Sequence, residues 1–205
     1  MKSCLTAIIL AILLSACAAP GNVNAPANVT PSPTPVATVS PAVEPASTPR
    51  PDEAGDAKED KFQGTAGITD KKARPVAAVV LAAIRTGTHG KFDRVVFEFS
   101  GSAMPGYHIE YIDKPVRSCG SGEVVPLAGD AWLEIRMTPA AAHTEQGQPT
   151  IKTRSFSPNL PIVKELKSTC DFEADVAWVA GVSTPNEYRV LELKDPARLV
   201  VDISH

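Results

Sequence analysis

Short apolar runs separated by Gly, Pro, Asn and Asp fill the chain from about residue 68 to its end. The clearest run is 94–99, in which Val95, Phe97 and Phe99 alternate with Arg94 and Glu98. A period of two is typical of a strand with one buried face, so the three apolar side chains are expected to point inward. By the same criterion we expect about nine strands, at 76–85, 94–99, 107–111, 123–127, 132–137, 150–156, 173–182, 188–193 and 199–203.

These strands predict an all-β domain over residues 68–205, an antiparallel β-sandwich, because their spacing is that of sandwiches and barrels. The glycines of 86–90 indicate a hairpin turn. One short helix is expected at 160–167, where Ile162, Val163 and Leu166 have helical spacing after a possible cap at Asn159. Long amphipathic helices do not alternate with the strands, which argues against an α/β nucleotide fold.

The amino end has the pattern of a bacterial export signal. Lys2 provides a positive charge, residues 5–14 form a short apolar core, and Ser15-Ala16 are the small residues of a cleavage point. Leu14-Ser15-Ala16-Cys17 resembles the lipobox, in which the cysteine receives a diacylglycerol and becomes the new amino terminus. We therefore expect a lipoprotein signal peptide at 1–16 and lipidation of Cys17. The alternative is an ordinary secretory signal in which Cys17 has no role.

Residues 17–67 are expected to be a disordered linker between the lipid anchor and the folded domain. The chain contains 19 prolines, and nine of them lie between Pro20 and Pro51. Such a sequence buries too little apolar surface to offset the entropy of ordering, and proline keeps it extended. As polyproline II, the 34 residues of 18–51 would span about 100 Å at ~3.1 Å per residue. The linker thus gives the domain reach from a membrane surface.

Two cysteines remain after cleavage and lipidation, and an oxidising compartment favours pairing them. A disulfide between Cys119 and Cys170 is the prediction, enclosing about 50 residues and worth at most about 4 kcal/mol on the loop-entropy model. A reactive thiol or half of a metal site is the alternative. Neither cysteine lies in a CxxC arrangement, which disfavours that alternative.

Two segments carry a resemblance to a known family. The first is residues 84–99, IRTGTHGKFDRVVFEF, followed by Pro105-Gly106-Tyr107, and the second is residues 195–203, DPARLVVDI. Together they resemble the AMIN-like domain of bacterial lipoproteins, a relative of the AMIN module found beside cell-wall amidases. The resemblance covers about 76–205. It implies a β-sandwich that binds envelope polymer, peptidoglycan above all, and positions envelope machinery without catalytic residues.

The same segments have a structural interpretation. Leu199, Val201 and Ile203 share the strand face expected in the core, and Arg198, Val200 and Asp202 share the opposite face. Asp93 stands at a strand start, where it can accept hydrogen bonds from turn amides. Its neighbour Arg94 can reach an adjacent strand, or contact a ligand.

No enzymatic site is predicted. The four histidines have none of the short spacings of a zinc site, and His143 with Glu145 is only a partial candidate in a polar loop. The chain has no Gly-x-Ser-x-Gly elbow, and 118–122 is better explained as a disulfide-bearing turn. Neither a metal nor a cofactor is expected. The net charge of −3 argues against a nucleic-acid partner.

Exposed aromatic residues are the best candidates for ligand contacts, because they stack on sugar faces. Trp132 precedes the inward set Leu133, Ile135 and Met137, so it is expected on the outer face. Tyr107, Tyr111 and Arg94 are the further candidates. The expected protein is a non-catalytic, lipid-anchored module at the cell membrane or outer membrane. It would bind peptidoglycan or an envelope protein. The alternatives are an exported cell-wall hydrolase and a carrier of a small apolar ligand.

Overall fold

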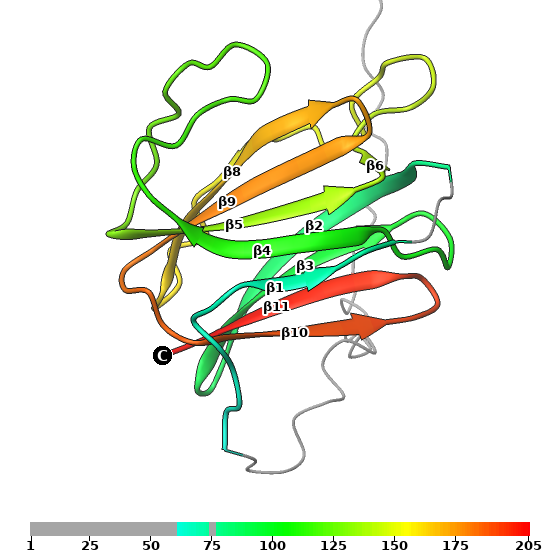
Figure 1. Cartoon of the computed structure of the whole chain (residues 1–205). Coiled ribbons are helices and arrows are strands. Elements are labelled where there is room, and N and C mark those ends of the chain that lie inside the picture. Colours follow the sequence, from blue (N-terminus) through cyan, green and yellow to red (C-terminus); the bar gives the residue numbers. More distant parts are fainter. Residues whose placement is uncertain (1–60, 74–76) are drawn as a thin grey trace, which may run out of the picture. The chain divides into compact units, whose positions relative to one another are not determined.

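Two stacked sheets make up the part of the chain that the structure, a computed structural model, describes: residues 61–73 and 77–205 (Figure 1). The six-stranded sheet has the order β1-β4-β5-β9-β8-β7, and the five-stranded sheet has the order β10-β11-β3-β2-β6. The strands are β1 Thr69–Lys71, β2 Val79–His89, β3 Phe92–Phe99, β4 Gly106–Ile112, β5 Ala131–Thr138, β6 Ala140–Ala141, β7 Ser155–Phe156, β8 Val163–Phe172, β9 Asp175–Val182, β10 Tyr188–Leu193 and β11 Arg198–Ser204. The all-β sandwich predicted from the alternating pattern is confirmed.

The strand pairs are antiparallel apart from β2 and β6, which run parallel over two residue pairs. The described residues hold eleven strands against about nine expected. Two expected strands are largely absent: 123–127 contributes one bridge, Val124 to Arg117, and 150–156 contributes only β7. The signal peptide 1–16, Cys17 and the linker up to residue 60 lie outside the described residues. No helix in the described part is long and apolar enough to cross a membrane.

The predicted helix at 160–167 is wrong, because β8 begins at Val163 and no described residue is helical. The pairing of β8 with β9 shifts its register between Val163 and Glu165. This β-bulge inserts a residue, so Val163 and Leu166 both reach the core although they are three apart in sequence. A bulged strand therefore imitates helical spacing. Asn159, expected as the cap, has a φ of 54° and lies in the irregular segment that precedes β8.

The hairpin turn is shorter than the predicted 86–90. Thr86, Gly87 and Thr88 pair with Val95, Arg94 and Asp93, so β2 continues to His89. The chain reverses at Gly90-Lys91, and Gly90 has the positive φ of 46° that this reversal requires. A glycine between two threonines is compatible with a strand as well as with a turn. In this protein the pairing with β3 makes these three residues part of β2.

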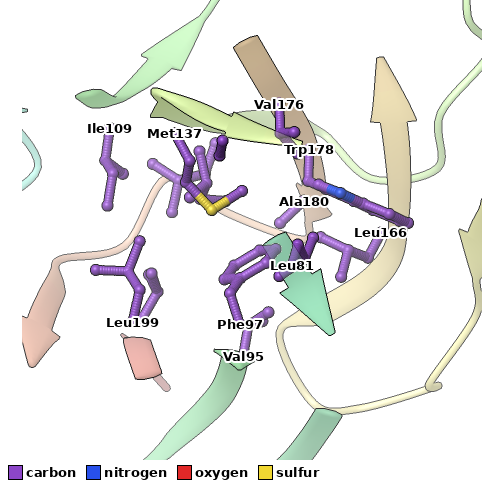
Figure 2. Packing of buried hydrophobic residues seen from close by; sticks show 14 of the residues in the cluster. Leu81, Val95, Phe97, Ile109, Met137, Leu166, Val176, Trp178, Ala180 and Leu199 are labelled. Atoms are coloured by element: carbon purple, nitrogen blue, oxygen red, sulfur yellow. The ribbon is translucent and has the colours of Figure 1, made fainter. Parts of the chain in front are cut away.

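The core lies between the two sheets and is built from the inward faces that the alternation predicted. Val95, Phe97 and Phe99 of β3 are at most 1% exposed, and the inward residues of β5 and β11 are fully buried. Figure 2 shows Val95 and Phe97 from one sheet facing Met137, Trp178 and Leu166 from the other. The core cluster extends from Val79 to Ile203, which are 124 positions apart in the sequence.

The charged residues that flank the core are buried as well, and each is paired. Asp93 accepts hydrogen bonds from the amides of Ile162 and Val163 at 2.7 and 2.9 Å, and its other oxygen lies 3.0 Å from Nε2 of His205. On the outer face of the five-stranded sheet, Arg94 donates two hydrogen bonds to Asp202, which is fully buried. The predicted roles of Asp93 and Arg94 in turn and strand contacts are confirmed.

An amino-terminal segment, residues 61–71, joins the two sheets along one edge. Thr65 exchanges two backbone hydrogen bonds of 2.8 Å with Tyr188 on β10, and a few residues later β1 pairs with β4 of the other sheet. The buried Tyr188 hydroxyl lies 2.6 Å from the carbonyl oxygen of Gly67 and 2.8 Å from that of Ile109. Residues 61–67, which the sequence assigned to the linker, thus contact the sandwich.

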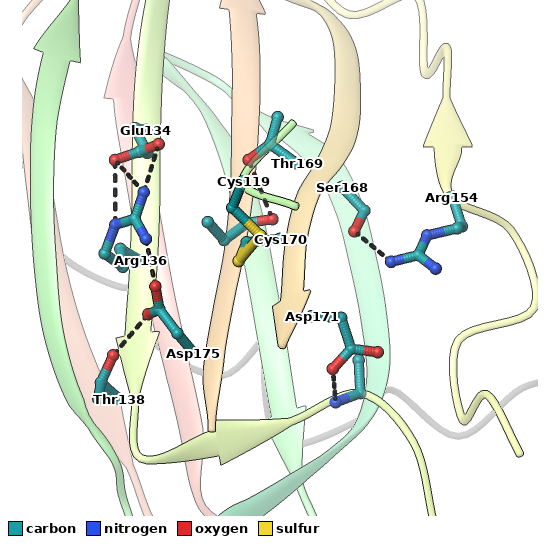
Figure 3. The surroundings of a disulfide bond; sticks show 12 residues. Cys119, Glu134, Arg136, Thr138, Arg154, Ser168, Thr169, Cys170, Asp171 and Asp175 are labelled. Atoms are coloured by element: carbon teal, nitrogen blue, oxygen red, sulfur yellow. Dashed lines mark hydrogen bonds and ion pairs between the residues drawn. A yellow bond between two sulfur atoms is a disulfide. The ribbon is translucent and has the colours of Figure 1, made fainter. Parts of the chain in front are cut away.

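The segment 113–127 crosses the outer face of the six-stranded sheet and is fastened there by the disulfide. Cys119 and Cys170 are joined by an S–S bond of 2.08 Å, which confirms the predicted pairing (Figure 3). The amide of Cys119 also donates to the carbonyl of Thr169 at 3.0 Å. Beneath this segment Val116, Trp132 and Val179 form a second apolar cluster.

Replacing Asp93 with Ala should lower the unfolding free energy by about 2–4 kcal/mol, since each buried amide without an acceptor costs about 1–3 kcal/mol. Burial raises the pKa of Asp93, but hydrogen bonds from Val163, His205, Ile162 and Thr88 outweigh it and hold this pKa below its ordinary value. The stabilisation by the charge should therefore be present above about pH 4 and be lost as the pH falls through the folded-state pKa.

Urea unfolding at a series of pH values measures this dependence, and Asp93→Asn, which keeps an acceptor oxygen without the charge, is the matched variant. The stability difference between wild type and Asp93→Asn should shrink on acidification. A difference that stays constant down to about pH 3 would contradict the assignment of Asp93 as a paired, ionised group.

The exported protein should yield a linked Cys119–Cys170 peptide in non-reducing mass spectrometry, with neither thiol open to alkylation. The double variant Cys119→Ser, Cys170→Ser should lose about 2–4 kcal/mol of unfolding free energy, because the bond closes a loop with a sequence separation of 51 residues. Two alkylated cysteines in the exported protein would refute the bond and restore the reactive-thiol alternative.

Candidate functional site

A pocket of about 380 Å³ lies where β1, β4 and β5 meet at one end of the six-stranded sheet. Its lining comes from three separate parts of the chain, namely Lys71, Lys72 and Ala73, then Gly106, Tyr107 and His108, and finally Arg136, Thr138 and Pro139. The pairing Lys71 to Tyr107 and Gly106 to Thr138 brings these segments together. The pocket therefore exists only once β1 has paired with β4.

Gly106 allows the three strands to approach one another at this point. A Cβ atom there would lie 2.6 Å from the amide nitrogen of Ala73 and 2.8 Å from the carbonyl oxygens of Lys71 and Thr138. These neighbours are backbone atoms, so they cannot move aside as a flexible side chain would. The glycine is required to hold residues 71–73 against β4, where they form one wall of the pocket.

On one side of the pocket, Glu192 of β10 orients both Lys71 and Tyr107. The Lys71 ammonium lies 2.6 Å from both carboxylate oxygens, and the Tyr107 hydroxyl donates to Oε1 at 3.0 Å. Burial, together with the hydrogen bond and the charge of Glu192, raises the pKa of Tyr107 to about 12. The phenol is therefore neutral at physiological pH, and its proton is directed away from the pocket toward Glu192.

On the outer face of the sheet, Arg136 lies between two carboxylates (Figure 3). Its Nε and Nη2 donate to Glu134 at 3.1–3.3 Å, and its Nη1 donates to Asp175. Asp175 also accepts a hydrogen bond of 2.6 Å from the Thr138 hydroxyl. Burial lowers the pKa of Arg136, but the two acids outweigh it, so the guanidinium stays charged and held in one orientation.

His108 is opposite Arg136 in the β4–β5 pairing, and it too lies between acids. Its Nδ1 lies 3.3 Å from Asp70, and its Nε2 lies 3.2 Å from Glu110. Burial by itself lowers the pKa of His108. The hydrogen bonds and charges of Glu110 and Asp70 outweigh this effect, so the pKa is raised above its ordinary value. The imidazole is thus fixed by Asp70 of the neighbouring strand β1 and by Glu110 of its own strand.

Lys72 differs from the other basic residues of the pocket. It is exposed, and within residues 61–73 and 77–205 it makes no ion pair or hydrogen bond. Its positive charge is not compensated by any carboxylate in that part of the chain. Lys72 is therefore available to a ligand without first giving up a partner.

Of the four ligand candidates suggested by the sequence, only Tyr107 lies at the pocket. Trp132 is on the outer face as expected, but the segment 113–127 covers it, leaving it 9% exposed with the Lys114 ammonium 3.9 Å from its ring centre. Tyr111 donates its hydroxyl proton to the carbonyl of Asn186, and Arg94 is paired with Asp202. These three side chains have structural contacts in the fold.

The sequence's partial candidate for hydrolytic chemistry, His143, lies within the described residues. They contain no group of three or more His, Cys, Asp or Glu side chains able to hold a metal ion. His143, which the sequence suggested beside Glu145, places its Nδ1 2.9 Å from Asp171, whose same oxygen accepts the amide of Ala142. Asp171 thus orients both the ring and the backbone of its loop.

Sequence reasoning missed Lys71, Lys72, His108, Arg136 and Thr138 as members of one site. The residues are separated by up to 67 positions, and each occurs within an ordinary alternating strand or just after one. The only local signal was the pair Lys71-Lys72 at the start of the folded part. Only the register of β1 on β4 and of β4 on β5 brings the segments together.

Comparison with known proteins gives one match. A family model described as the AMIN-like domain matches residues 79–205, which is more than half of the chain and contains every strand except β1. Searches of curated proteins and of solved structures found no match. AMIN-like domains are associated with peptidoglycan and envelope machinery outside the cytoplasm. With its whole sandwich from β2 to β11 matched, the chain belongs to the AMIN-like domain family.

Proposed function

We propose that this protein is a non-catalytic, lipid-anchored module that binds peptidoglycan and holds envelope machinery near it. The observation that carries the proposal is the AMIN-like match over 79–205, because that family is associated with peptidoglycan. The pocket between β1, β4 and β5, which has Lys72 and Arg136 in its lining, offers a ligand a place to bind on the sandwich.

The lipid anchor is the second part of the proposal. It is supported by the sequence Leu14-Ser15-Ala16-Cys17 after a short apolar core, in residues outside those that the structure describes. Each acyl chain contributes about 0.8 kcal/mol per buried CH₂, so two or three chains would keep the protein on a membrane. The export signal is consistent with the extracytoplasmic location of the AMIN-like family.

The absence of catalysis is the third part. Hydrolysis requires a nucleophile or an activated water beside a base within hydrogen-bond reach. Cys119 and Cys170 are joined to each other, so neither thiol is free to act as a nucleophile. The basic residues of the pocket are suited to orienting a ligand, because acids fix three of them in place.

Replacing Cys17 with Ser should abolish membrane retention, because serine has no thiol to receive the diacylglycerol. The exported protein should appear in the soluble fraction and incorporate no labelled palmitate. Cys4→Ser is the matched control, since Cys4 lies in the segment that cleavage removes, and it should fractionate as wild type does. A Cys17→Ser protein that remains in membranes and takes up palmitate would overturn the anchor.

The soluble chain from Ala18 to His205 should sediment with purified sacculi and release no soluble muropeptides from them. We expect an affinity in the micromolar range or weaker, about −8 kcal/mol at best, since the aromatic candidates Trp132 and Tyr111 are engaged in the fold. Muropeptide release that persists in a His143→Ala control would refute the non-catalytic proposal. If the chain does not sediment with sacculi, we would infer that its ligand is an envelope protein and not the polymer.

A further inference from the structure

We propose that the pocket between β1, β4 and β5 binds a free carboxylate of a peptidoglycan stem peptide. The inference rests on the proposed function, which names the polymer, and adds the chemical group that is recognised and the residues that recognise it. Lys72 is the principal contact, and Arg136, on the outer face of the sheet, is a second donor in the lining. The argument depends on the donors of the pocket, on its charge and on its size.

The ionisable side chains that line the pocket include cations but no carboxylate. Its ionisable lining residues are Lys71, Lys72, Tyr107, His108 and Arg136, and no Asp or Glu is among the lining residues. The acids that pair with this lining reach it from neighbouring positions, namely Asp70, Glu110, Glu134, Asp175 and Glu192. A ligand that enters the pocket therefore meets the donor groups first.

Unused N–H groups remain after the internal pairs are counted. The Lys71 ammonium has three N–H donors, of which Glu192 accepts two. The Arg136 guanidinium has five N–H donors, and Glu134 and Asp175 together make four contacts with it. An ionised carboxylate accepts hydrogen bonds only, and it matches such a set of donors.

The charges around the pocket restrict an anionic ligand to one small group beside Lys72. Five carboxylates, Asp70, Glu110, Glu134, Asp175 and Glu192, surround the lining and repel a polymer with charge all along its length. Lys72 is uncompensated within the described residues, so a single carboxylate that reaches it gains a contact without displacing any pair. The position of Lys72 thus selects where on the polymer the contact is made.

The size of the pocket agrees with this ligand. Its volume of about 380 Å³ is in the range of small-molecule sites, about 300–1,000 Å³, and holds an amino-acid residue with its carboxylate. The wall formed by 71–73 is held by Gly106, and the opposite wall is fixed by the Arg136 network. A wall fixed before binding reduces the ordering cost that a weak ligand would otherwise incur.

The test uses the soluble chain from Ala18 to His205, with its disulfide formed, and a matched pair of synthetic stem peptides. One peptide keeps its free carboxylates, and the other has every carboxylate amidated. In ¹⁵N–¹H spectra the free acid should shift the amides of Lys72, Gly106 and Thr138 in a saturable way, and the amidated peptide should not. Equal shifts from both peptides, or shifts at other residues only, would overturn the proposal.

A variant of Lys72 distinguishes binding at the pocket from attraction by the net charge of the protein. Lys72→Ala should weaken binding of the free-acid peptide about two- to fivefold, the range of an exposed ion pair, and Lys72→Arg should restore most of it. Lys152→Ala is the control, because Lys152 is also exposed and its loss changes the net charge equally. Equal weakening by Lys72→Ala and Lys152→Ala would overturn the proposal, since it would show attraction by net charge alone.

Sedimentation with sacculi distinguishes this inference from the proposed function. If wild type sediments but the free-acid peptide shifts no pocket amide, the pocket assignment is wrong and the peptidoglycan function stands. If the peptide binds at Lys72 but sacculi are not bound, the pocket binds carboxylates and the polymer is not the ligand. Loss of sacculi binding in Lys72→Ala, with Lys152→Ala unaffected, is the result that supports both.

Discussion

The buried hydroxyl of Tyr188 joins three parts of the chain. Tyr188 belongs to the five-stranded sheet, and its oxygen lies within hydrogen-bond distance of Gly67 in the amino-terminal segment and of Ile109 in the six-stranded sheet. Burial raises its pKa, so the proton stays available to these carbonyls. Together with the backbone bonds of Thr65 and the ladder of β1 on β4, this contact holds the amino-terminal segment, and with it the wall of the pocket formed by 71–73, against both sheets.

The location of the pocket follows from how the sandwich uses its aromatic and charged residues. Trp178 and Phe97 fill the space between the sheets, Trp132 lies under the disulfide-bound segment 113–127, and Arg94 is paired with a fully buried Asp202. Side chains committed to the fold in this way are not available to stack on a sugar. What remains at the strand ends is a set of lysine, arginine and histidine side chains oriented by acids, and recognition by hydrogen bonds is the chemistry they offer.

The sequence predicts the faces of strands better than their ends. The alternation in β3, β5 and β11 identified the buried sets correctly, because a strand with one buried face has a period of two. The bulge in β8 made Val163 and Leu166 share a face at a spacing of three, which imitates a helix, and no local signal reveals a bulge. The disulfide could be predicted because two cysteines allow one pairing. The pocket could not, because pairing between distant strands creates it.

A weak pocket is sufficient for a domain of the proposed kind. A tether converts binding to a nearby polymer into an almost intramolecular event, with an effective concentration set by the length and stiffness of the linker. Since residues 61–67 contact the sandwich, the linker proposed from the sequence is shortened to about residue 60, and its proline-rich part still precedes the fold. A contact made through a single lysine therefore needs little affinity of its own, because the tether keeps the domain near its ligand.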